Sequence, residues 1–369
     1  MLSSWTWGTW DDAQAPSAHQ QPQQGPRDVR APRPCRRRAL HASPSGRRSA
    51  KVYEVCLGRL EESDAICLRA PPYLPLPPPT AAGNEGGEAL RRAQEGAARA
   101  RGAARARDDR AAAKRQQLCS LAAALAPAMA ALEAPLVADL CGGSGHAALF
   151  LAQVFPRARF VVVDNKPGSV AIARERISAA GLCARVRTAL ADVREYAAPF
   201  DVGVALHACG EATDLALAAA TRCRAAAFAV VPCCVGKLSA VGEQVALPRS
   251  RAAREAGVTR QEFIMLARAA DVHTVPGIER GGGTREQRRR RLAKTAVEMD
   301  RMAQLAEDHR YCTHMMLLQP MDASAKNDIA VGFRAGGGPC PYCAHKKTYG
   351  EFVAPWAGDA KVSSREAVP

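Results

Sequence analysis

The sequence lacks the features of a membrane-bound or exported chain. No run approaches the roughly 18 consecutive apolar residues that a membrane helix needs. The start of the chain shows no basic segment followed by an apolar one. The 13 cysteines are scattered and odd in number, which favours free thiols in a reducing compartment. We therefore expect a soluble, cytoplasmic protein without a membrane partner, although the Arg-, Ser- and Ala-rich residues 26–50 leave organelle targeting open.

Branched aliphatic residues are scarce in the first third of the chain. Residues 1–111 are rich in arginine, alanine and proline, and the regular apolar segments come later. A segment with so few large apolar side chains cannot bury enough surface to offset the entropy lost on folding. We predict a disordered, low-complexity leader over residues 1–111, one folded domain over 112–334 and a flexible tail over 335–369.

Acidic residues are outnumbered by basic ones, 36 to 51, which leaves a formal net charge of +15. Much of the excess stands in arginine clusters at residues 35–48, 89–110 and 285–294. Clusters that share one face bind polyanions, because each neutralised phosphate releases counterions. Isolated charge runs are also commonly just solvated, so charge alone leaves nucleic-acid binding and a solvated surface as equal alternatives.

Short apolar runs alternate with segments of helical spacing through the predicted domain. Each apolar run ends near a turn and predicts a buried strand. The expected strands lie at residues 136–140, 160–163, 184–192, 200–210 and 225–234. The expected helices lie at residues 112–132, with a kink or break at Pro127, at 146–155 and at 169–180. This alternation predicts a parallel sheet with helices on both faces.

The pattern changes after the fifth strand. Residues 238–284 form an insertion with a helix near 260–271, and a long amphipathic helix follows at 284–309. Two further strands, 311–320 and 327–333, are separated by a short polar loop, which favours an antiparallel hairpin. Five parallel strands followed by such a hairpin are the layout of the Rossmann-like class I methyltransferase fold, which is an α/β fold.

A glycine-rich loop with the pattern D-x-C-x-G-x-G follows the first strand. It differs from the G-x-G-x-x-G loop that binds a dinucleotide, because an acidic residue stands at its head and its last glycine comes earlier. A carboxylate there suits the cationic methionine part of S-adenosyl-L-methionine and would repel a pyrophosphate. The alternative is an ordinary tight turn between strand and helix. The candidate cofactor-binding residues of the loop are Asp139, Cys141, Gly142, Gly143 and Gly145.

Two more acidic residues stand at successive strand ends. Ligands of open parallel sheets bind beyond the carboxyl ends of the strands. Asp164 ends the second strand, where a carboxylate would receive two ribose hydroxyls, and Asn165 follows it. Asp192 ends the third strand, where an adenine amine would be hydrogen-bonded. With Asp139, acidic residues recur at three strand ends, which favours a cofactor site over a simple turn.

The fourth and fifth strand ends carry a histidine and three cysteines. Neighbouring strands lie about 4.8 Å apart, so His207, Cys209, Cys233 and Cys234 are expected to converge. Three interpretations stay open: buried small residues beside a satisfied histidine, a metal site of unusual spacing, or catalytic residues around the transferred methyl with neutral His207 as a base. We take the four as candidate catalytic residues and assign no metal to them.

Five segments resemble a known family. "VADLCGGSGHAAL", "VVVDNKPGS", "VGVALHACGEATDLAL", "VVPCCVGKL" and "SAKNDIAVG" are similar, in this order, to the methyltransferase-like domain of the glutathione S-transferase C-terminal domain-containing protein family. The resemblance covers about residues 112–334 and extends to methyltransferases with an L-H-x-C-G strand end and a later C-C pair, whose relatives include enzymes that act on tRNA and rRNA. It implies a Rossmann-like fold and S-adenosylmethionine binding. The implied cofactor positions are Asp139, Gly143, Gly145 and Asp164, and the signature positions are His207, Cys209, Cys233 and Cys234.

Some motifs of related proteins are missing or incomplete. Residues 1–115 show no run of core helices of the glutathione transferase kind, so glutathione binding is not expected. No N/D-P-P-Y/F motif follows the fourth strand, so the acceptor atom is not specified. Cys340, Cys343 and His345 in the tail amount to half a zinc site, against the alternative of a flexible, reduced tail.

Taken together, the motifs predict an S-adenosylmethionine-dependent methyltransferase. RNA is the favoured substrate, with tRNA and rRNA as the candidate classes, because of the basic segments and the related families. Most of the catalysis would come from positioning a nucleophile in line with the methyl group. The alternative is a scaffold or interaction protein that keeps the fold with weak activity or none.

Overall fold

The computed structural model describes residues 44–63, 72–77, 104–240, 245–271, 278, 282–324, 326–334, 338–350 and 352–353. The chain divides into two units, Met1–Ala42 and Ser43–Pro369, and all of the described residues belong to the second. Most of the predicted leader therefore lies outside the described residues. In the part of the chain that is described, no helix combines the length and the apolar character needed to cross a bilayer.

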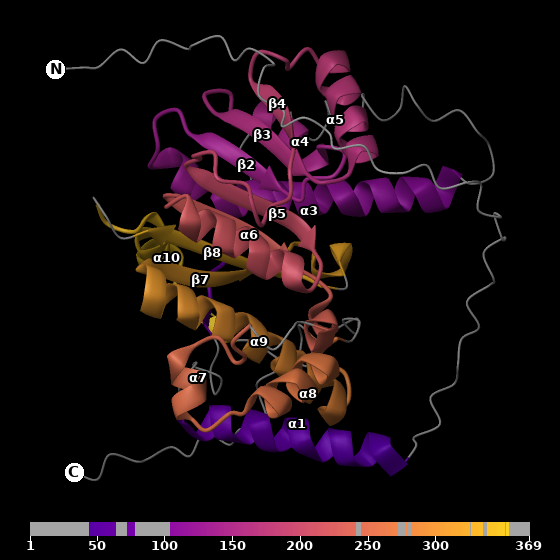
Figure 1. The fold of residues 1–369 in the computed structure, drawn as a ribbon, viewed down its shortest axis with the longest axis vertical. Helices are drawn as coiled ribbons and strands as arrows, with labels where there is room; N and C mark the ends of the chain where they lie inside the picture. Colours follow the sequence, from indigo (N-terminus) through magenta and orange to yellow (C-terminus); the bar gives the residue numbers. More distant parts are fainter. Residues whose placement is uncertain are drawn as a thin grey trace, which may run out of the picture. The chain divides into compact units, whose positions relative to one another are not determined.

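A nine-stranded sheet with the order β4-β3-β2-β5-β6-β8-β7-β1-β9 runs through this unit (Figure 1). The strands are β1 (Pro72–Tyr73), β2 (Leu136–Leu140), β3 (Arg159–Asp164), β4 (Val186–Leu190), β5 (Val202–Ala208), β6 (Ala227–Pro232), β7 (Tyr311–Leu317), β8 (Asp328–Arg334) and β9 (Phe352–Val353). Strands β4, β3, β2, β5 and β6 are parallel, and β8 is antiparallel to both β6 and β7. The predicted Rossmann-like methyltransferase fold, with its terminal antiparallel hairpin, is confirmed.

Helices cover both faces of the sheet. One face is covered by α3 (Ala104–Ala130), α4 (His146–Val154) and α5 (Pro167–Ala179), and the other by α6 (Glu211–Arg222) and α9 (Arg285–His309). Apolar side chains from alternate strand positions fill both interfaces, as expected of strands buried on both sides. Helix α3 does not break at Pro127 but continues to Ala130.

Helix α1 (Pro44–Ser63) is part of the folded unit, which corrects the prediction of a leader without structure up to residue 111. Its side chains Cys56, Leu57 and Leu60 are fully buried, and it packs on α9 and on α8 (Arg260–Ala270), which with α7 (Arg251–Glu255) belongs to the predicted insertion. These apolar residues recur at helical spacing within a stretch dominated by charged residues. The composition of 111 residues taken together concealed this amphipathic helix.

The predicted tail is also folded in part. Helix α10 (Pro341–Tyr349) packs on α3, and strand β9 pairs with β1, which itself pairs with β7. The hydroxyl of Tyr342, which is fully buried, donates to the carbonyl oxygen of Ala124 at 3.1 Å. The prediction of a flexible tail from residue 335 onward is therefore wrong for α10. This helix is held by contacts with α3, which is distant in sequence, and sequence patterns within the tail do not show such contacts.

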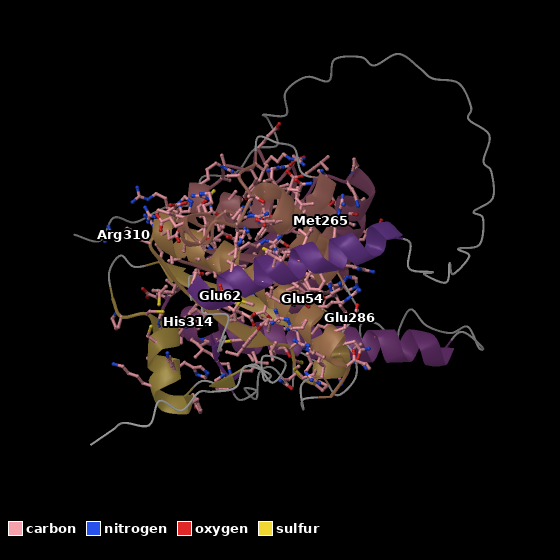
Figure 2. All side chains as sticks on the ribbon, turned by 90° about the horizontal axis from the view of Figure 1, so that it is seen from below. Glu54, Glu62, Met265, Glu286, Arg310 and His314 are labelled. Carbon is pink, nitrogen blue, oxygen red and sulfur yellow. The ribbon has the colours of Figure 1, made fainter. Side chains whose placement is uncertain are left out.

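The arginine cluster of α9 is used inside the fold. Arg289 donates to Glu54 at 2.9 Å and to Glu61 at 2.7 Å, both on α1, and Arg290 pairs with Glu286 at 2.6 Å. Figure 2 labels Glu54 and Glu286 on these two neighbouring helices. Arg289 of this cluster therefore fastens α1 to α9, and Arg290 is paired within α9, so neither side chain is left free for a polyanion.

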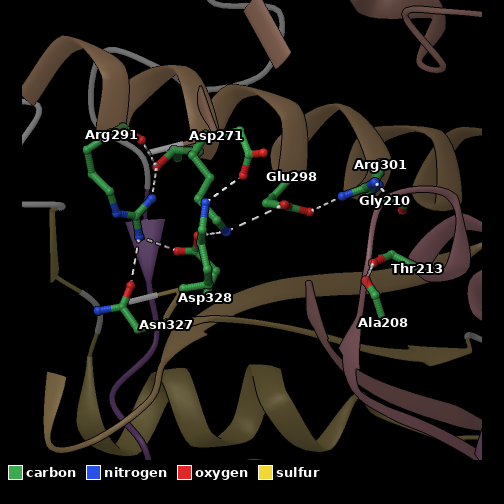
Figure 3. Close-up of polar contacts among 12 residues, drawn as sticks. Ala208, Gly210, Thr213, Asp271, Arg291, Glu298, Arg301, Asn327 and Asp328 are labelled. Carbon is green, nitrogen blue, oxygen red and sulfur yellow. Dashed lines mark hydrogen bonds and ion pairs between the residues drawn. The ribbon is translucent and has the colours of Figure 1, made fainter. Parts of the chain in front are cut away.

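A network of charged side chains lies between α9, α6 and β8 (Figure 3). Its four bases are Arg249, Arg291, Lys294 and Arg301, and its four acids are Asp214, Glu298, Asp300 and Asp328. Asp328 accepts from Arg291 and Lys294 at 2.5 Å each, and all three side chains are buried. The network holds four acids and four bases, so each charged side chain has a partner of opposite charge. These attractions offset the free energy that the charges lose when they are removed from water.

Candidate cofactor cleft

A cleft of about 620 Å³ lies beyond the carboxyl ends of strands β2 to β5. This is the edge at which open parallel sheets bind ligands. Six of the residues predicted from the sequence line it, namely Cys141, Asp164, Asn165, Asp192, His207 and Cys209. The other predicted residues, Asp139, Gly142, Gly143, Gly145, Cys233 and Cys234, lie behind or beside the lining. The loop after β2 and the ends of β3, β4 and β5 therefore contribute to one cleft.

Asp139 supports the glycine loop from behind. Its side chain is 1% exposed, and Oδ2 accepts the backbone N–H of Ala148 in the first turn of α4 at 3.1 Å. A Cβ atom at Gly142 would come within 2.7 Å of this carboxylate, so only glycine fits there. Burial raises the pKa of Asp139 to about 7, although the Ala148 amide and Lys114 oppose the shift. The carboxylate contacts the helix start and does not line the cleft, so its role in cofactor binding stays a prediction.

Asp164 closes the loop from the cleft side. Oδ2 accepts the backbone N–H of Gly143 at 2.9 Å, and Oδ1 accepts that of Lys166 at 3.0 Å. A carboxylate offers about four acceptor sites, so each oxygen keeps capacity for one further donor. Asp164 is thus oriented by the backbone and able to receive two hydroxyl groups.

Asp192 and Asn165 form the adjoining wall. Asp192 Oδ1 accepts the backbone N–H of Arg194 at 2.9 Å, and Oδ2 accepts from Arg194 Nη1 at 3.2 Å and from Asn165 Nδ2 at 3.4 Å. Arg194 also reaches Glu211 at the start of α6, at 3.5 Å. These donors keep the pKa of Asp192 below its ordinary value, with the Arg194 amide making the largest contribution. Asp192 is therefore ionised at neutral pH.

His207 occupies a strained position in β5. Its φ angle is 65°, and the pairing of β5 with β6 shifts register between Leu206 and Ala208. A side chain in this backbone region costs about 1–3 kcal/mol and commonly marks a functional position. The strain brings the imidazole to the cleft lining and to α3, where His207 Nε2 lies 2.7 Å from Gln117 Oε1.

Gln117 defines the tautomer of His207. Its Nε2 donates to the carbonyl oxygen of Ala323 at 2.6 Å, so its Oε1 must accept from the imidazole. The neutral ring therefore carries its proton on Nε2, and within the described residues Nδ1 has no hydrogen-bond partner. Burial and, to a smaller extent, the positive charge of Lys114 lower the pKa of His207 to about 4. The ring is a neutral acceptor at physiological pH.

We expect Gln117→Leu to weaken this tautomer preference. The buried Nε2–H would lose its acceptor, at a cost of about 1–3 kcal/mol, and the proton would distribute over both ring nitrogens. Nitrogen NMR of the full chain with labelled histidine would report the tautomer and the pKa of His207. Gln116→Leu, at the exposed neighbouring position, is the matched control and should leave both unchanged. A pKa near the ordinary 6.5 in the unaltered protein would contradict this description.

The three cysteines gather beside the cleft without His207. Cys209 Sγ lies 2.7 Å from Cys233 Sγ and 3.6 Å from Cys234 Sγ, and these atoms form a group that could ligate a metal. His207 is not in that group, so the structure does not join the imidazole to the thiols as a common metal site. Burial raises the pKa values of Cys233 and Cys234 above the ordinary thiol value, which disfavours them as nucleophiles.

Several cleft residues were not identified from the sequence. Lys166, Arg194 and Lys237 line the cleft, and Gln117 orients His207 from α3. The three basic residues each follow a strand end, which is a signal that could have identified them. Gln117 had no such signal, because it lies 90 residues from His207 in the sequence.

Residues 113–241 match a family model described as a methyltransferase domain. This range includes strands β2 to β6 and every residue of the cleft lining described above. The chain therefore carries a methyltransferase domain, in agreement with its fold.

The chain is similar to curated proteins named glutathione S-transferase C-terminal domain-containing protein. The Xenopus laevis protein is 33% identical over 227 residues, which are 61% of this chain and 35% of the relative. The Homo sapiens protein is 30% identical over 227 residues, 61% of this chain and 34% of the relative. These matches confirm the family resemblance of the motifs, and the chain aligns with about a third of the length of these relatives.

A solved structure of magnesium protoporphyrin IX methyltransferase from Synechocystis PCC 6803 is also similar. It is 12% identical, the match covers 68% of this chain and 91% of that chain, and the TM-score is 0.37. The fold assignment rests on the strand order and not on this likeness.

Proposed function

We propose that the protein is an S-adenosylmethionine-dependent methyltransferase that acts on RNA. The observation that carries the proposal is the single cleft in which Asp164, Asp192 and His207 meet at consecutive ends of parallel strands. A simple strand-to-helix turn has no need for ionisable side chains at these three positions.

The residues of the cleft fit the cofactor. The volume of about 620 Å³ lies within the usual range of 300–1,000 Å³ for ligand pockets. Asp164 has free acceptor capacity for the two ribose hydroxyls, and Asp192 is an ionised acceptor for the adenine amine. The turn at Gly142 and Gly143 brings backbone close to the same edge. When bound, S-adenosylmethionine supplies an activated methyl group for transfer to a nucleophile.

The protein's own contribution is orientation and proton acceptance. Asp164 and the loop would hold the cofactor in one pose, which removes the entropic cost of aligning the reactants. His207 would present Nδ1 to a hydroxyl or amine nucleophile, because Gln117 occupies Nε2. With a pKa of about 4 the imidazole is a weak base. It stays neutral as the pH falls through 6.5, and activity that needs the neutral ring is lost only toward pH 4.

The rim of the cleft favours an anionic substrate. Lys166 and Lys237 are exposed, follow the ends of β3 and β6, and have no ion-pair partner among the described residues. Arg194 also lines the cleft and is more than half exposed, although it pairs with Asp192 and Glu211. Phosphates of a nucleic acid would be neutralised by such cations. The arginine clusters at residues 35–48 and 89–110 would add to this attraction, but their side chains lie outside the described part of the chain.

The test measures binding and transfer on the full chain. S-adenosylmethionine is titrated calorimetrically, and methyl-labelled cofactor is then incubated with total cellular RNA and with total cellular protein. The expected result is binding together with label in ribonuclease-sensitive material. Label only in protein would overturn RNA as substrate. Neither binding nor label would overturn the methyltransferase proposal and support the scaffold alternative.

A further inference from the structure

Strand β7 presents a cysteine and a histidine on one face. Cys312 and His314 are two residues apart, so their side chains point to the same side of the strand. Cys312 Sγ lies 3.4 Å from His314 Nε2, and both side chains are partly buried. The strand thereby offers one thiol and one imidazole at the distance of neighbouring ligands.

Helix α10 brings two more thiols to the same place. Cys340 is the residue before the helix, Pro341 is its first residue, and the backbone N–H of Cys343 donates to the carbonyl oxygen of Cys340 at 3.1 Å. Cys343 Sγ lies 3.4 Å from Cys312 Sγ and 3.7 Å from His314 Nε2. Figure 2 shows His314 beside this yellow helix. The tight turn at the helix start therefore directs both cysteines toward β7.

The four side chains have the composition and spacing of a tetrahedral metal site. All four ligand atoms lie within 4.8 Å of one another. Zinc–sulfur distances of about 2.3 Å and zinc–nitrogen distances of about 2.0 Å place neighbouring sulfurs about 3.8 Å apart and a sulfur and nitrogen about 3.5 Å apart in a tetrahedral site. The distances between 3.4 and 3.7 Å agree with this geometry. Three thiolates and one imidazole favour zinc over harder ions.

We propose that Cys312, His314, Cys340 and Cys343 bind one zinc ion, which fastens α10 to strand β7. Four protein ligands fill the coordination sphere, as in structural and not catalytic zinc sites. The site is separate from the cofactor cleft and does not depend on the proposed methyltransferase activity.

The ligand set differs from the half site visible in the sequence. His345 Nε2 lies 2.7 Å from the carbonyl oxygen of Pro75, so it donates to the backbone and does not join the cysteines. The fourth ligand is His314, which lies 29 residues before Cys343. The proposal therefore keeps Cys340 and Cys343 of the half site and replaces His345 by Cys312 and His314.

The zinc would organise the side of the fold that supports His207. Helix α10 packs on α3 through Tyr342, and α3 carries Gln117, the hydrogen-bond partner of His207. Because the ion binds the folded and not the unfolded chain, it stabilises this arrangement.

The decisive experiment determines metal content on the full chain, purified without a metal-binding tag. The expected result is that the double variant Cys340→Ser/Cys343→Ser contains one zinc per chain less than the unaltered protein. The exposed Cys183 belongs to neither of the two candidate metal groups found among the described residues, so Cys183→Ser should retain the full zinc content, as should His345→Gln. A zinc content of the double variant equal to that of the unaltered protein, or zinc that is lost only with Cys209→Ser, would overturn the proposal.

Cobalt replacement tests the ligand set without relying on the folding of that double variant. Cobalt bound to the unaltered protein should show the absorption of a tetrahedral thiolate site. With Cys312→Ser the thiolate charge-transfer intensity should fall by about a third, because two of three thiolates remain. A protein that binds no zinc or cobalt, or whose four side chains include a disulfide after purification under reducing conditions, would refute the site.

Discussion

Replacing Asp164 with asparagine is expected to weaken S-adenosylmethionine binding by about a hundredfold or more. The carboxylate would accept two ribose hydroxyls, and hydrogen bonds to a charged group contribute about 1.5–3 kcal/mol each. Their combined loss corresponds to two or more factors of ten at about 1.4 kcal/mol per factor. Asparagine keeps one oxygen for the amide of Gly143 or Lys166, so the loop stays close to its native course. Calorimetric titration of the full chain measures the affinity.

A matched control exists at the opposite edge of the sheet. Asp201 Oδ2 accepts the backbone N–H of Leu136 at 2.8 Å, at the amino end of the strands and away from the cleft. Asp201→Asn removes a similar charge from a similar contact and should leave the affinity unchanged. Asp164→Ala should abolish measurable binding while the far-ultraviolet circular dichroism stays native. An Asp164 variant that binds within twofold of the unaltered protein would remove Asp164 from the site.

Replacing Asp328 with asparagine is expected to destabilise the fold by about 3–5 kcal/mol, the usual result of breaking a buried ion pair by removing one partner. Arg291 and Lys294 would remain buried beside a neutral amide. Although burial alone would raise the pKa of Asp328, these two bases hold it below its ordinary value. Its contribution is therefore fully present above the unfolded pKa of about 4 and is lost as the pH falls through the lower folded value. Urea denaturation of the full chain at neutral pH measures the change.

Glu286→Gln is the matched control, because it removes a carboxylate that pairs with an arginine of the same helix, α9, but at an exposed position. Glu286 pairs with Arg290 at 2.6 Å, but its side chain is 65% exposed. An exposed pair of this kind contributes at most about 1 kcal/mol, because water screens the charges. If both variants shifted the unfolding midpoint equally, the buried network would not be the source of the stability assigned to it.

Strands β2 to β8 could be predicted because each carries its own signal. A continuous apolar run is needed wherever both faces of a strand are covered, and the turn residues mark its ends. Strands β1 and β9 have two residues each, too few for any periodicity. Helix α1 has an amphipathic pattern, but the arginine-rich surroundings hid it. The charged partners that hold it, Glu54 with Arg289 above all, are 235 residues apart and follow only from tertiary structure.

The residues of the cleft likewise fall into two groups, those with a local sequence signal and those that depend on contacts between distant segments. Asp164 and Asp192 could be assigned to one rim, because the carboxyl ends of parallel strands meet at one edge. The hydrogen bond of Asp139 to the amide of Ala148 could not be predicted, since this amide belongs to the next helix and the contact does not follow from spacing alone. Gln117 and His314 were missed for a related reason, because each acts across a contact between segments distant in sequence.

Because α1 packs on α8 and α9, a fragment of the chain that is meant to fold must include α1. Expressed alone, residues 112–334 would lack Cys56, Leu57 and Leu60 and would leave the apolar surfaces beneath them open to water. Each large apolar side chain removed in this way forfeits about 1.5–3 kcal/mol of burial. Such a fragment would also lose Glu54 and Glu61, the carboxylate partners of Arg289. The segment that resembles known methyltransferases is thus expected to need α1 for stable folding. A protein cut at the boundaries of that segment would expose apolar surface and would tend to misfold and aggregate.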